Sequence, residues 1–522
     1  MSEHIAAHDE LDAAPYNATV DLLERNLAGG RAERPYLRTA TATWSYGEVA
    51  AAADAAGAGL LELGLRPGDR VMLATRDRPE FVITFWGAMK AGLIPIPIAQ
   101  GLSVSDVHFI VSDSEARAIV CDASSAGVVL RAADDSRTTC LFVGDASHEG
   151  ARSWSEVCGG SATLAAASTT GDDIALWLYT SGTTGLPKAV MHRHRNLRAA
   201  PNGLAEQVIG LSTDDVVLSV SKMYFAYGLG NSVYLPASVG ASVVLNDGPV
   251  VPASIQQLID ETEPTVIFGV PAFFDGFSRL EDVKLPSSVR MVLSAGEALS
   301  SHLFERFKER FGHSLLDGLG STEALHHVTS NTPDDALAGS AGRALEGYEI
   351  EIRDRDEQPV GEGTSGELWV RGPTVFAGYW RRPDLTARVK SDSWIRTGDQ
   401  ARIVDGRVYH EGRLDDLIKL GGIWVAPLEI EDVLRGHGDV DDAAVVTVDE
   451  GAGVPLLKAF VLSQRDDDED LAKELVGLCR SRLARFKVPK YFEVVAEMPR
   501  TPTGKLKRFV LRGRSATPTE RG

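Results

Sequence analysis

The chain has 522 residues, enough for two to four domains, and 44% hydrophobic with 24% charged residues is the composition of an ordinary globular protein. Lys plus Arg number 53 and Asp plus Glu number 73, which gives a formal net charge of −20. This charge argues against a nucleic acid or an anionic membrane as the main partner, although a local positive site can still bind a small anion.

The first 15 residues, MSEHIAAHDELDAAP, are acidic and lack the apolar core of a secretory signal. The cysteines lie far apart, without a CxxC pair or a Cys/His ligand spacing, so the sequence indicates neither a disulfide framework nor a structural zinc. We therefore expect a cytoplasmic enzyme. The cysteines are Cys121, Cys140, Cys158 and Cys479.

Helical and β-branched segments alternate in the first half of the chain. Residues 46–65 have a helical period, whereas residues 69–75 and 116–123 are short apolar runs typical of buried strands. Residues 81–99 are apolar enough to imitate a membrane span, but Lys90 and two prolines argue against one. We predict a buried helix that ends near Gly92, followed by a strand.

A loop rich in hydroxyls and glycine, YTSGTTGLPKAVMH, occupies residues 179–192. It is not a Walker P-loop, in which Lys follows the last Gly directly and Ser or Thr comes next. Here Leu186 and Pro187 separate Gly185 from Lys188, and Ala189 follows the lysine. Its glycines allow backbone N–H groups to point at an anion, and its lysine adds a mobile charge. By local chemistry alone, a surface turn and a phosphate-binding loop both remain open.

Further strand, loop and helix units follow at residues 266–277 and 290–300, and in parallel sheets such loops collect ligands. From about residue 340 short strands and turns indicate an antiparallel subdomain. Near the C-terminus, two strand-like runs precede a predicted helix over residues 468–486, and the strand YFEVV follows. These last elements form a unit of about a hundred residues.

Eight motifs along the chain, taken together, resemble those of the adenylate-forming enzymes, which include acyl-CoA synthetases, peptide-synthetase adenylation domains and luciferases. These enzymes use ATP to convert a carboxylate into an acyl-adenylate and pyrophosphate. The motifs are MKAGLIPIP (89–97), YTSGTTGLPKAV (179–190), SAGEAL (294–299), DGLGSTE (317–323), GELWVRG (366–372), IRTGD (395–399), GRLDDLIKLGG (412–422) and PRTPTGKLKR (499–508). Ala189 stands where the family usually has glycine, and we expect function to survive this added methyl.

The resemblance implies an α/β fold with a large N-terminal domain of stacked mixed α/β sheets, a small antiparallel β subdomain and a mobile C-terminal α+β domain. We place the adenylation domain at residues 1–413, with its β subdomain from about 340, and the C-terminal domain at residues 414–522. The hinge is expected at Asp415. Lys419, Gly421 and Gly422 would reach the active site when the thioester forms.

The resemblance also assigns catalytic roles. Lys505 would reach the carboxylate and the α-phosphate, Glu323 would hold Mg²⁺, Thr322 would bind the adenylate phosphate, and Lys188 would meet the outer phosphates. Asp399 would accept the ribose hydroxyls. The full expected ATP and AMP set is Thr180, Ser181, Gly182, Thr183, Thr184, Gly185, Lys188, Ala295, Gly296, Glu297, Asp317, Gly318, Leu319, Gly320, Ser321, Thr322, Asp399 and Arg413.

Three stretches resemble the benzoate-CoA and related aryl-CoA ligases: residues 17–31, 221–232 and 317–331. By this resemblance a flat acid pocket would be lined by Phe225, Ala226, Tyr227, Gly269, Gly320 and His326, with Gly318 nearby. Because adjacent residues in a regular element face opposite ways, we expect at most one of His326 and His327 to enter it, and a purely structural His326 stays an equal alternative. His192 and His194 form an HxH pair, but no third metal ligand is evident.

The sequence thus predicts an AMP-forming acid–thiol ligase that activates benzoate or a hydroxy- or aminobenzoate and transfers it to coenzyme A, with ATP and Mg²⁺. An aryl-acid adenylating enzyme that loads a carrier-protein pantetheine is the alternative. Since no carrier domain follows residues 499–508, we favour coenzyme A. The expected partners are small molecules, without nucleic acid or membrane, and the expected oligomer is a monomer or homodimer.

Overall fold

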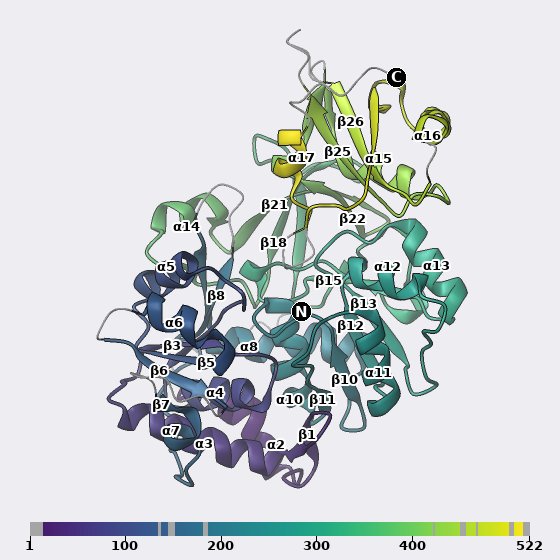
Figure 1. Cartoon of the computed structure of the whole chain (residues 1–522). Helices are drawn as coiled ribbons and strands as arrows, with labels where there is room; N and C mark the ends of the chain where they lie inside the picture. The colour runs from purple at the N-terminus through teal and green to yellow at the C-terminus, as the bar shows by residue number, and fades with distance from the viewer. Residues whose placement is uncertain are drawn as a thin grey trace.

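The computed structural model describes residues 14–133, 137–144, 152–180, 186–420, 423–448, 456–465, 468–500 and 506–514. Two parallel sheets with helices on their faces make up the lower part of the molecule in Figure 1, and the last elements of the chain gather at its upper end. The antiparallel strands β18, β21 and β22 lie between these two parts.

A seven-stranded sheet has the order β14-β13-β12-β10-β11-β1-β2, and only β1 and β2 pair antiparallel. Along each of its central strands, successive side chains point alternately into two hydrophobic cores. In β12, Val266 and Phe268 join the core shared with the second sheet, whereas Ile267 packs under the outer helices. The strands are β1 (Pro35–Arg38), β2 (Thr43–Ser45), β10 (Val216–Ser219), β11 (Ser242–Val244), β12 (Val266–Gly269), β13 (Met291–Ser294) and β14 (Leu315–Asp317).

A five-stranded parallel sheet has the order β4-β3-β5-β6-β7. Its strands alternate in the same way, because Val71 and Leu73 of β3 face the shared core and Met72 and Ala74 face a smaller one. The strands are β3 (Arg70–Ala74), β4 (Ile94–Pro97), β5 (Ala118–Asp122), β6 (Thr139–Val143) and β7 (Arg152–Ser153).

Helices cover both sheets. In the segment that imitated a membrane span, α4 (Pro79–Lys90) is a buried helix followed by β4, as predicted, and the part of the chain that the structure describes holds no helix long and apolar enough to cross a bilayer. The remaining helices are α2 (Arg25–Ala28), α3 (Tyr46–Glu62), α5 (Val104–Ser114), α6 (Ala126–Ala132), α7 (Trp154–Cys158), α8 (His194–Pro201), α9 (Ala226–Leu229), α10 (Leu235–Val239), α11 (Pro252–Thr262), α12 (Pro271–Arg279) and α13 (Ser301–Phe311).

From about residue 340 the chain forms antiparallel strands, as the sequence predicted. One of them, β19, also pairs with the earlier hairpin of β8 and β9. One sheet has the order β17-β18-β21-β20, with β22 also paired to β21, and a smaller sheet joins β19, β9 and β8. The elements are β8 (Ile174–Thr180), β9 (Lys188–Arg193), β15 (Thr329–Ser330), β16 (Arg343–Ala344), β17 (Glu349–Arg353), β18 (Gly366–Arg371), β19 (Gly378–Tyr379), α14 (Pro383–Val389), β20 (Lys390–Ser391), β21 (Trp394–Val404) and β22 (Arg407–Arg413).

The C-terminal elements form a separate core under a three-stranded sheet, β25-β26-β27. The predicted helix over 468–486 begins as expected but ends at Arg482, because Ala484 adopts an extended conformation and a short 3-10 turn follows it. The elements are β23 (Ile418–Leu420), β24 (Ile423–Val425), α15 (Pro427–Arg435), β25 (Asp442–Val448), β26 (Leu456–Leu462), α16 (Asp468–Arg482), β27 (Tyr491–Val495) and α17 (Arg508–Arg514).

The predicted fold class is therefore confirmed: a large α/β part with parallel sheets, an antiparallel subdomain and a C-terminal α+β unit. The boundary between residues 413 and 414 stays a prediction.

Candidate active site

The hydroxyl-rich loop is the connection of a β-hairpin. Strand β8 ends at Thr180 and β9 begins at Lys188, and these two residues are paired across the hairpin. The intervening expected phosphate ligands, Ser181, Gly182, Thr183, Thr184 and Gly185, lie outside the described residues. The hairpin therefore fixes Lys188 at the base of this loop.

Lys188, Glu323 and Tyr379 form one polar cluster at that base. The Lys188 ammonium donates a hydrogen bond of 2.7 Å to the Tyr379 hydroxyl, which donates one of 2.6 Å to Glu323 Oε1. The distance from Lys188 Nζ to Glu323 Oε1 is 3.6 Å, and Nζ lies 4.0 Å from the centre of the Tyr379 ring. Burial, reinforced by the Glu323 carboxylate, raises the pKa of Tyr379, so the phenol keeps its proton.

The sequence analysis did not find Tyr379. It lies on β19, which pairs with β9 so that Tyr379 faces Val190, almost two hundred residues earlier in the chain. Only the pairing of these strands brings the phenol to Lys188, and none of the eight motifs contains it.

Thr322 and Glu323 occupy a short 3-10 turn, Thr322–Ala324, which the Ser321 hydroxyl caps by accepting a hydrogen bond from the Ala324 N–H. His192 of β9 fixes this turn from the other side, since its Nε2 donates to the Thr322 carbonyl at 2.8 Å. Burial lowers the pKa of His192 to about 4, so this imidazole is neutral at pH 7. One side of the turn is thereby tied to the hairpin that carries Lys188.

Asp399 and Arg413 meet on β21 and β22, where they are register partners. Arg413 Nη1 donates to Asp399 Oδ1 at 3.0 Å, and His410 Nε2 lies 3.3 Å from the same oxygen. Burial alone raises the pKa of Asp399, but His410 and Arg413 outweigh it and hold that pKa below the usual value. The carboxylate is ionised and oriented, as acceptance of two hydroxyls requires.

The other expected nucleotide ligands follow the carboxyl ends of β13 and β14, where ligands of parallel sheets gather. The Ala295 N–H donates to the Gly269 carbonyl at 3.3 Å, and the Gly318 N–H donates to the Ser294 carbonyl at 3.1 Å. The second bond holds two motifs, SAGEAL and DGLGSTE, side by side, and the first joins SAGEAL to the end of β12. They position Ala295, Gly296, Glu297, Asp317, Gly318, Leu319, Gly320 and Ser321 at one edge of the sheet.

Asp317 is a buried carboxyl in this edge. Burial raises its pKa well above the ordinary value, and among the described residues its Oδ1 has no hydrogen-bond partner. A protonated carboxyl can donate a hydrogen bond, and the sequence alone did not indicate such a donor at position 317.

The expected acid pocket is built around Tyr227. Phe225 precedes α9, and Ala226 and Tyr227 are its first two residues. The Tyr227 ring lies 6.0 Å from Phe268 in an edge-to-face arrangement, and 5.6 Å from His326. Position 269 must be glycine, because a Cβ there would lie 2.6 Å from the Phe274 ring. Only the backbone of Gly269 can therefore contact a ligand.

The sequence analysis expected at most one of His326 and His327 to enter the pocket, and the structure brings both of them beside Tyr227. Both are buried, their ring centres are 5.6 and 5.3 Å from that of Tyr227, and their Nδ1 atoms are 3.1 Å apart. The physical reason is that Leu325 has a φ of +65°, so residues 325–327 form no regular helix or strand and the alternation of faces does not hold.

The expected hinge and thioester residues are only partly described. Asp415 is exposed in the turn after β22, and Lys419 of β23 is exposed opposite Trp424. Lys505, Gly421 and Gly422 lie outside the described residues. Arg500 forms an isolated β-bridge with Leu506, and its guanidinium lies 3.8 Å from the Glu297 carboxylate. Residue 500 therefore lies beside SAGEAL.

Glu323 fits a Mg²⁺ ligand by its chemistry, because Mg²⁺ typically takes one or two protein carboxylates plus phosphate oxygens. The Tyr379 hydroxyl holds this carboxylate in place through its Oε1 atom. His192 and His194 do not converge: His194 Nδ1 instead accepts from the Ala18 N–H at 3.1 Å. A surface group of His437, Asp439 and Glu474 is occupied by Arg465, which lies 3.0 Å from both carboxylates.

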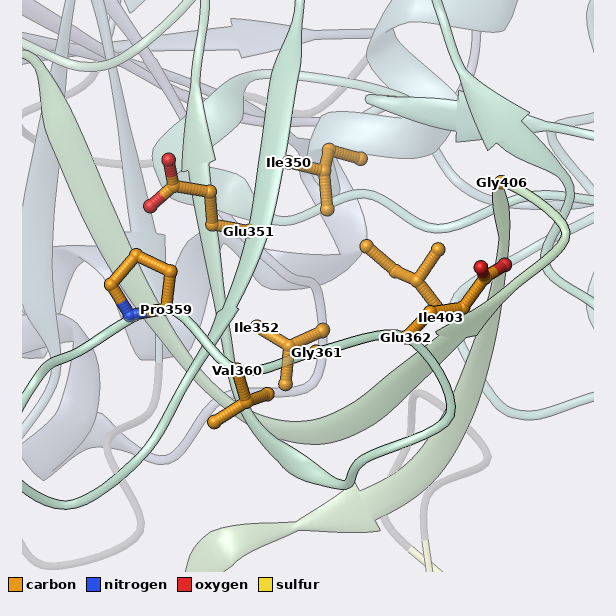
Figure 2. A pocket seen from close by; sticks show the side chains of 9 residues that line it. All are labelled: Ile350, Glu351, Ile352, Pro359, Val360, Gly361, Glu362, Ile403 and Gly406. Carbon is orange, nitrogen blue, oxygen red and sulfur yellow. The ribbon is translucent and has the colours of Figure 1, made fainter.

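Figure 2 shows a pocket in the antiparallel sheet. None of its lining residues belongs to the expected site. They are Ile350, Glu351, Ile352, Pro359, Val360, Gly361, Glu362, Ile403 and Gly406.

Comparison with known proteins assigns the chain to a family. Residues 23–380 match the AMP-binding enzyme family, and residues 429–505 match its C-terminal domain. The chain is 36% identical to a 4-hydroxybenzoate–CoA/benzoate–CoA ligase of Rhodopseudomonas palustris over 95% of this chain and 94% of the relative. It is 37% identical to the p-hydroxybenzoic acid–AMP ligase FadD22 of Mycobacterium tuberculosis, over 95% of this chain and 68% of that protein.

Among solved structures, the anthranilate CoA ligase AuaEII in complex with anthranoyl-AMP superposes with a TM-score of 0.92 at 32% identity, over 98% of this chain and 99% of that one. The match covers both the sheets that carry the site and the C-terminal unit. The chain therefore belongs to the AMP-binding enzyme family, in its aryl-CoA ligase group, and is an enzyme of the AMP-forming acid–thiol ligase type.

Proposed function

We propose that this enzyme adenylates an aromatic carboxylic acid, benzoate or a hydroxy- or aminobenzoate, and then transfers the aroyl group to coenzyme A. In the first step a carboxylate oxygen attacks the α-phosphorus of ATP and pyrophosphate leaves. In the second step the thiol attacks the acyl carbon, and AMP leaves with the carboxylate oxygen that joined the phosphorus.

The first step brings two anions together, so it needs cations and fixed positions. Lys188, held by the Tyr379 hydroxyl at the base of the loop, is proposed to meet the β,γ-phosphates that leave as pyrophosphate. Lys505 is proposed to bridge the carboxylate and the α-phosphate. Glu323 would hold a Mg²⁺ ion, which would supply charge neutralisation at the phosphates.

The nucleoside is proposed to bind across the sheet edge. Asp399 is ionised and its Oδ1 is oriented by Arg413, which suits acceptance of the ribose hydroxyls. Thr322 lies in the turn that His192 ties to the hairpin and would donate its hydroxyl to the adenylate phosphate. These contacts would bind ATP and the acyl-adenylate alike.

One observation carries the choice of an aromatic acid. The segment 321–327 holds Thr322 and Glu323 at one end and, at the other, two imidazoles whose rings are tilted by 44° and 59° against that of Tyr227. A group of aromatic rings therefore adjoins the proposed phosphate ligands on one short stretch of backbone, which suits an aromatic acid whose carboxylate reaches the α-phosphate.

The test is incubation of the protein with ATP, Mg²⁺, coenzyme A and a panel of benzoates, phenylacetate, cinnamates and short fatty acids. We expect AMP, pyrophosphate and an aroyl-CoA, with benzoates ahead of the aliphatic acids. Formation of ADP, or activity with fatty acids alone, would show that the proposal is wrong.

A carrier-protein pantetheine is the second candidate acceptor, because the chain is also 37% identical to the mycobacterial p-hydroxybenzoic acid–AMP ligase, whose name does not include coenzyme A. Adenylation would be unchanged and only the second step would differ. Aroyl transfer to free coenzyme A is therefore to be compared with transfer to a phosphopantetheinylated carrier protein. A carrier preference with little coenzyme A product would favour the second candidate.

A further inference from the structure

The pair His326–His327 is the end of a hydrogen-bond chain that starts at a backbone carbonyl. The Ser219 hydroxyl donates to the Ser221 carbonyl at 3.1 Å, so its lone pairs are left to accept. Asn231 Nδ2 donates to Ser219 Oγ at 3.4 Å, which turns Asn231 Oδ1 toward His326 Nε2 at 3.1 Å.

This chain fixes the tautomer of both imidazoles. Asn231 Oδ1 only accepts, so His326 carries its proton on Nε2. Burial lowers the pKa of His326 to about 4 and that of His327 well below its ordinary value, so both rings are neutral at pH 7. His326 Nδ1 is then an acceptor, and His327 Nδ1, 3.1 Å away, must be the donor.

The last atom of the chain, His327 Nε2, is left as an acceptor. His327 is only 3% exposed, and no donor from the described part of the chain reaches this nitrogen. A buried acceptor without a donor is costly, which makes this atom a place where a donor from a ligand would bind favourably.

Two glycines fix where this acceptor lies. A Cβ at Gly230 would be 2.3 Å from His326 Cδ2, and a Cβ at Gly318 would be 2.3 Å from His327 Cδ2 and 2.7 Å from its Nε2. The two imidazole rings therefore occupy the space that side chains at positions 230 and 318 would need. The His327 ring lies against Gly318 of DGLGSTE, and its centre is 5.3 Å from that of Tyr227, a residue expected to line the acid pocket.

We propose that His327 Nε2 accepts a hydrogen bond from a ring hydroxyl or amino group of the acid, so that the enzyme selects benzoates with a donor substituent. This inference rests on the proposed function and adds a substrate class to it. The discriminating group is the donor hydrogen, because methyl and fluoro substituents of similar size leave the acceptor unpaired.

The test compares kcat/KM for AMP formation with hydroxy-, amino-, methyl- and fluorobenzoates at each ring position. We expect a hydroxyl or amino group at one position to exceed methyl and fluoro at that position by about 10- to 100-fold. In His327→Leu this ratio should fall to about 1.

Two further variants separate selection from folding. His327→Gln restores an acceptor oxygen and should recover part of the preference. His194→Asn removes a buried imidazole that bonds Ala18 instead and should leave the preference unchanged. Histidine ¹⁵N spectra of the native protein provide a readout besides activity, and one resonance that His327→Leu removes should show an unprotonated Nε2.

The outcomes are distinct. If no aryl acid gives AMP, both the proposed function and this inference are wrong. If benzoates are adenylated but donor substituents give no advantage, or if His327→Leu keeps the advantage, only this inference is wrong. A protonated His327 Nε2 would also contradict it.

Discussion

At the scale of single residues, the Tyr379 phenol joins Lys188 to Glu323 and so couples the cation expected at the phosphates to the carboxylate expected at Mg²⁺. A hydrogen bond to a charged group is worth about 1.5–3 kcal/mol, and 1.4 kcal/mol corresponds to a factor of ten. The phenol is therefore expected to position both groups.

Tyr379→Phe should reduce the rate of adenylation by about 10- to 100-fold, because it removes both hydrogen bonds and keeps the ring. Pyrophosphate exchange into ATP measures this step. The matched control is Tyr409→Phe on β22, where Arg402 stacks 5.3 Å from the ring and the hydroxyl serves no expected site group. Native exchange in Tyr379→Phe would exclude the positioning role.

His194 predicts a pH dependence of stability. Burial lowers its pKa from 6.5 to about 4 in the folded chain, so as pH falls below 6.5 the unfolded state takes up a proton that the folded state refuses. This residue thus removes about 1.4 kcal/mol of stability per pH unit between 6.5 and about 4.

His194→Asn keeps an acceptor for the Ala18 N–H but cannot titrate. Its free energy of unfolding should fall less steeply with decreasing pH than that of the native protein, by about one proton between pH 6.5 and 4. Urea unfolding of both proteins across this range gives the difference. Parallel curves would contradict the assignment.

The sequence could propose site residues where one motif contains the whole feature, as for Glu323 in GSTE and Asp399 in RTGD. Their assigned roles stay predictions. It did not indicate Tyr379, nor the bond between His326 and Asn231, because these contacts join residues that lie from 56 to 191 positions apart. Such partners depend on the fold and leave no local pattern.

At the scale of elements, α3 and α4 pack closely against each other in the shared core. A Cβ at Gly87 would lie 2.3 Å from the Ala53 carbonyl oxygen, and one at Gly57 would lie 2.6 Å from the Gly87 carbonyl oxygen. Neither obstacle is a flexible side chain, so the two helices can approach this closely only with glycine at both positions.

Gly87→Ala should therefore lower the free energy of unfolding by about 3 kcal/mol, since the helices must separate to admit the methyl group. Gly127→Ala in α6 is the control in the same part of the fold, because its added Cβ meets only an Arg131 nitrogen at 3.6 Å. That change should be neutral or stabilise the helix by up to about 1 kcal/mol. Equal effects in urea unfolding would refute the packing argument.

Several elements could be predicted from their hydrophobic period. Strands such as β3, β5 and β12 and the helix α4 lie where the sequence placed them. The end of α16 at Arg482 was missed, because apolar side chains continue at Leu483 and Phe486 after the backbone has left the helix. A periodic pattern reports burial and cannot locate the last helical residue.

At the scale of the whole molecule, ion pairs hold the C-terminal unit against the large α/β part. Arg279 of α12 pairs with the Asp441 carboxylate and also donates to its carbonyl at 3.2 Å, while Arg500 lies 3.8 Å from Glu297. These contacts place Arg500 beside Glu297 of the expected nucleotide site. We expect them to favour the arrangement in which adenylation occurs.

Asp441→Asn should slow adenylation by about three- to fivefold, because a partly exposed ion pair contributes about 1 kcal/mol. Transfer to coenzyme A from added aroyl-adenylate should not slow. Asp470→Asn, which affects only the exposed pair with Lys473 within α16, is the control. An equal loss in both half-reactions would show that Asp441 has no such selective role.

The central claim is that the carboxylate oxygen becomes bonded to the α-phosphorus, and an isotope experiment tests it directly. The enzyme is incubated with ATP, Mg²⁺, coenzyme A and hydroxybenzoate that carries ¹⁸O in both carboxylate oxygens. We predict AMP with one ¹⁸O atom, and pyrophosphate with none. Unlabelled AMP, or label in inorganic phosphate, would contradict the acyl-adenylate route.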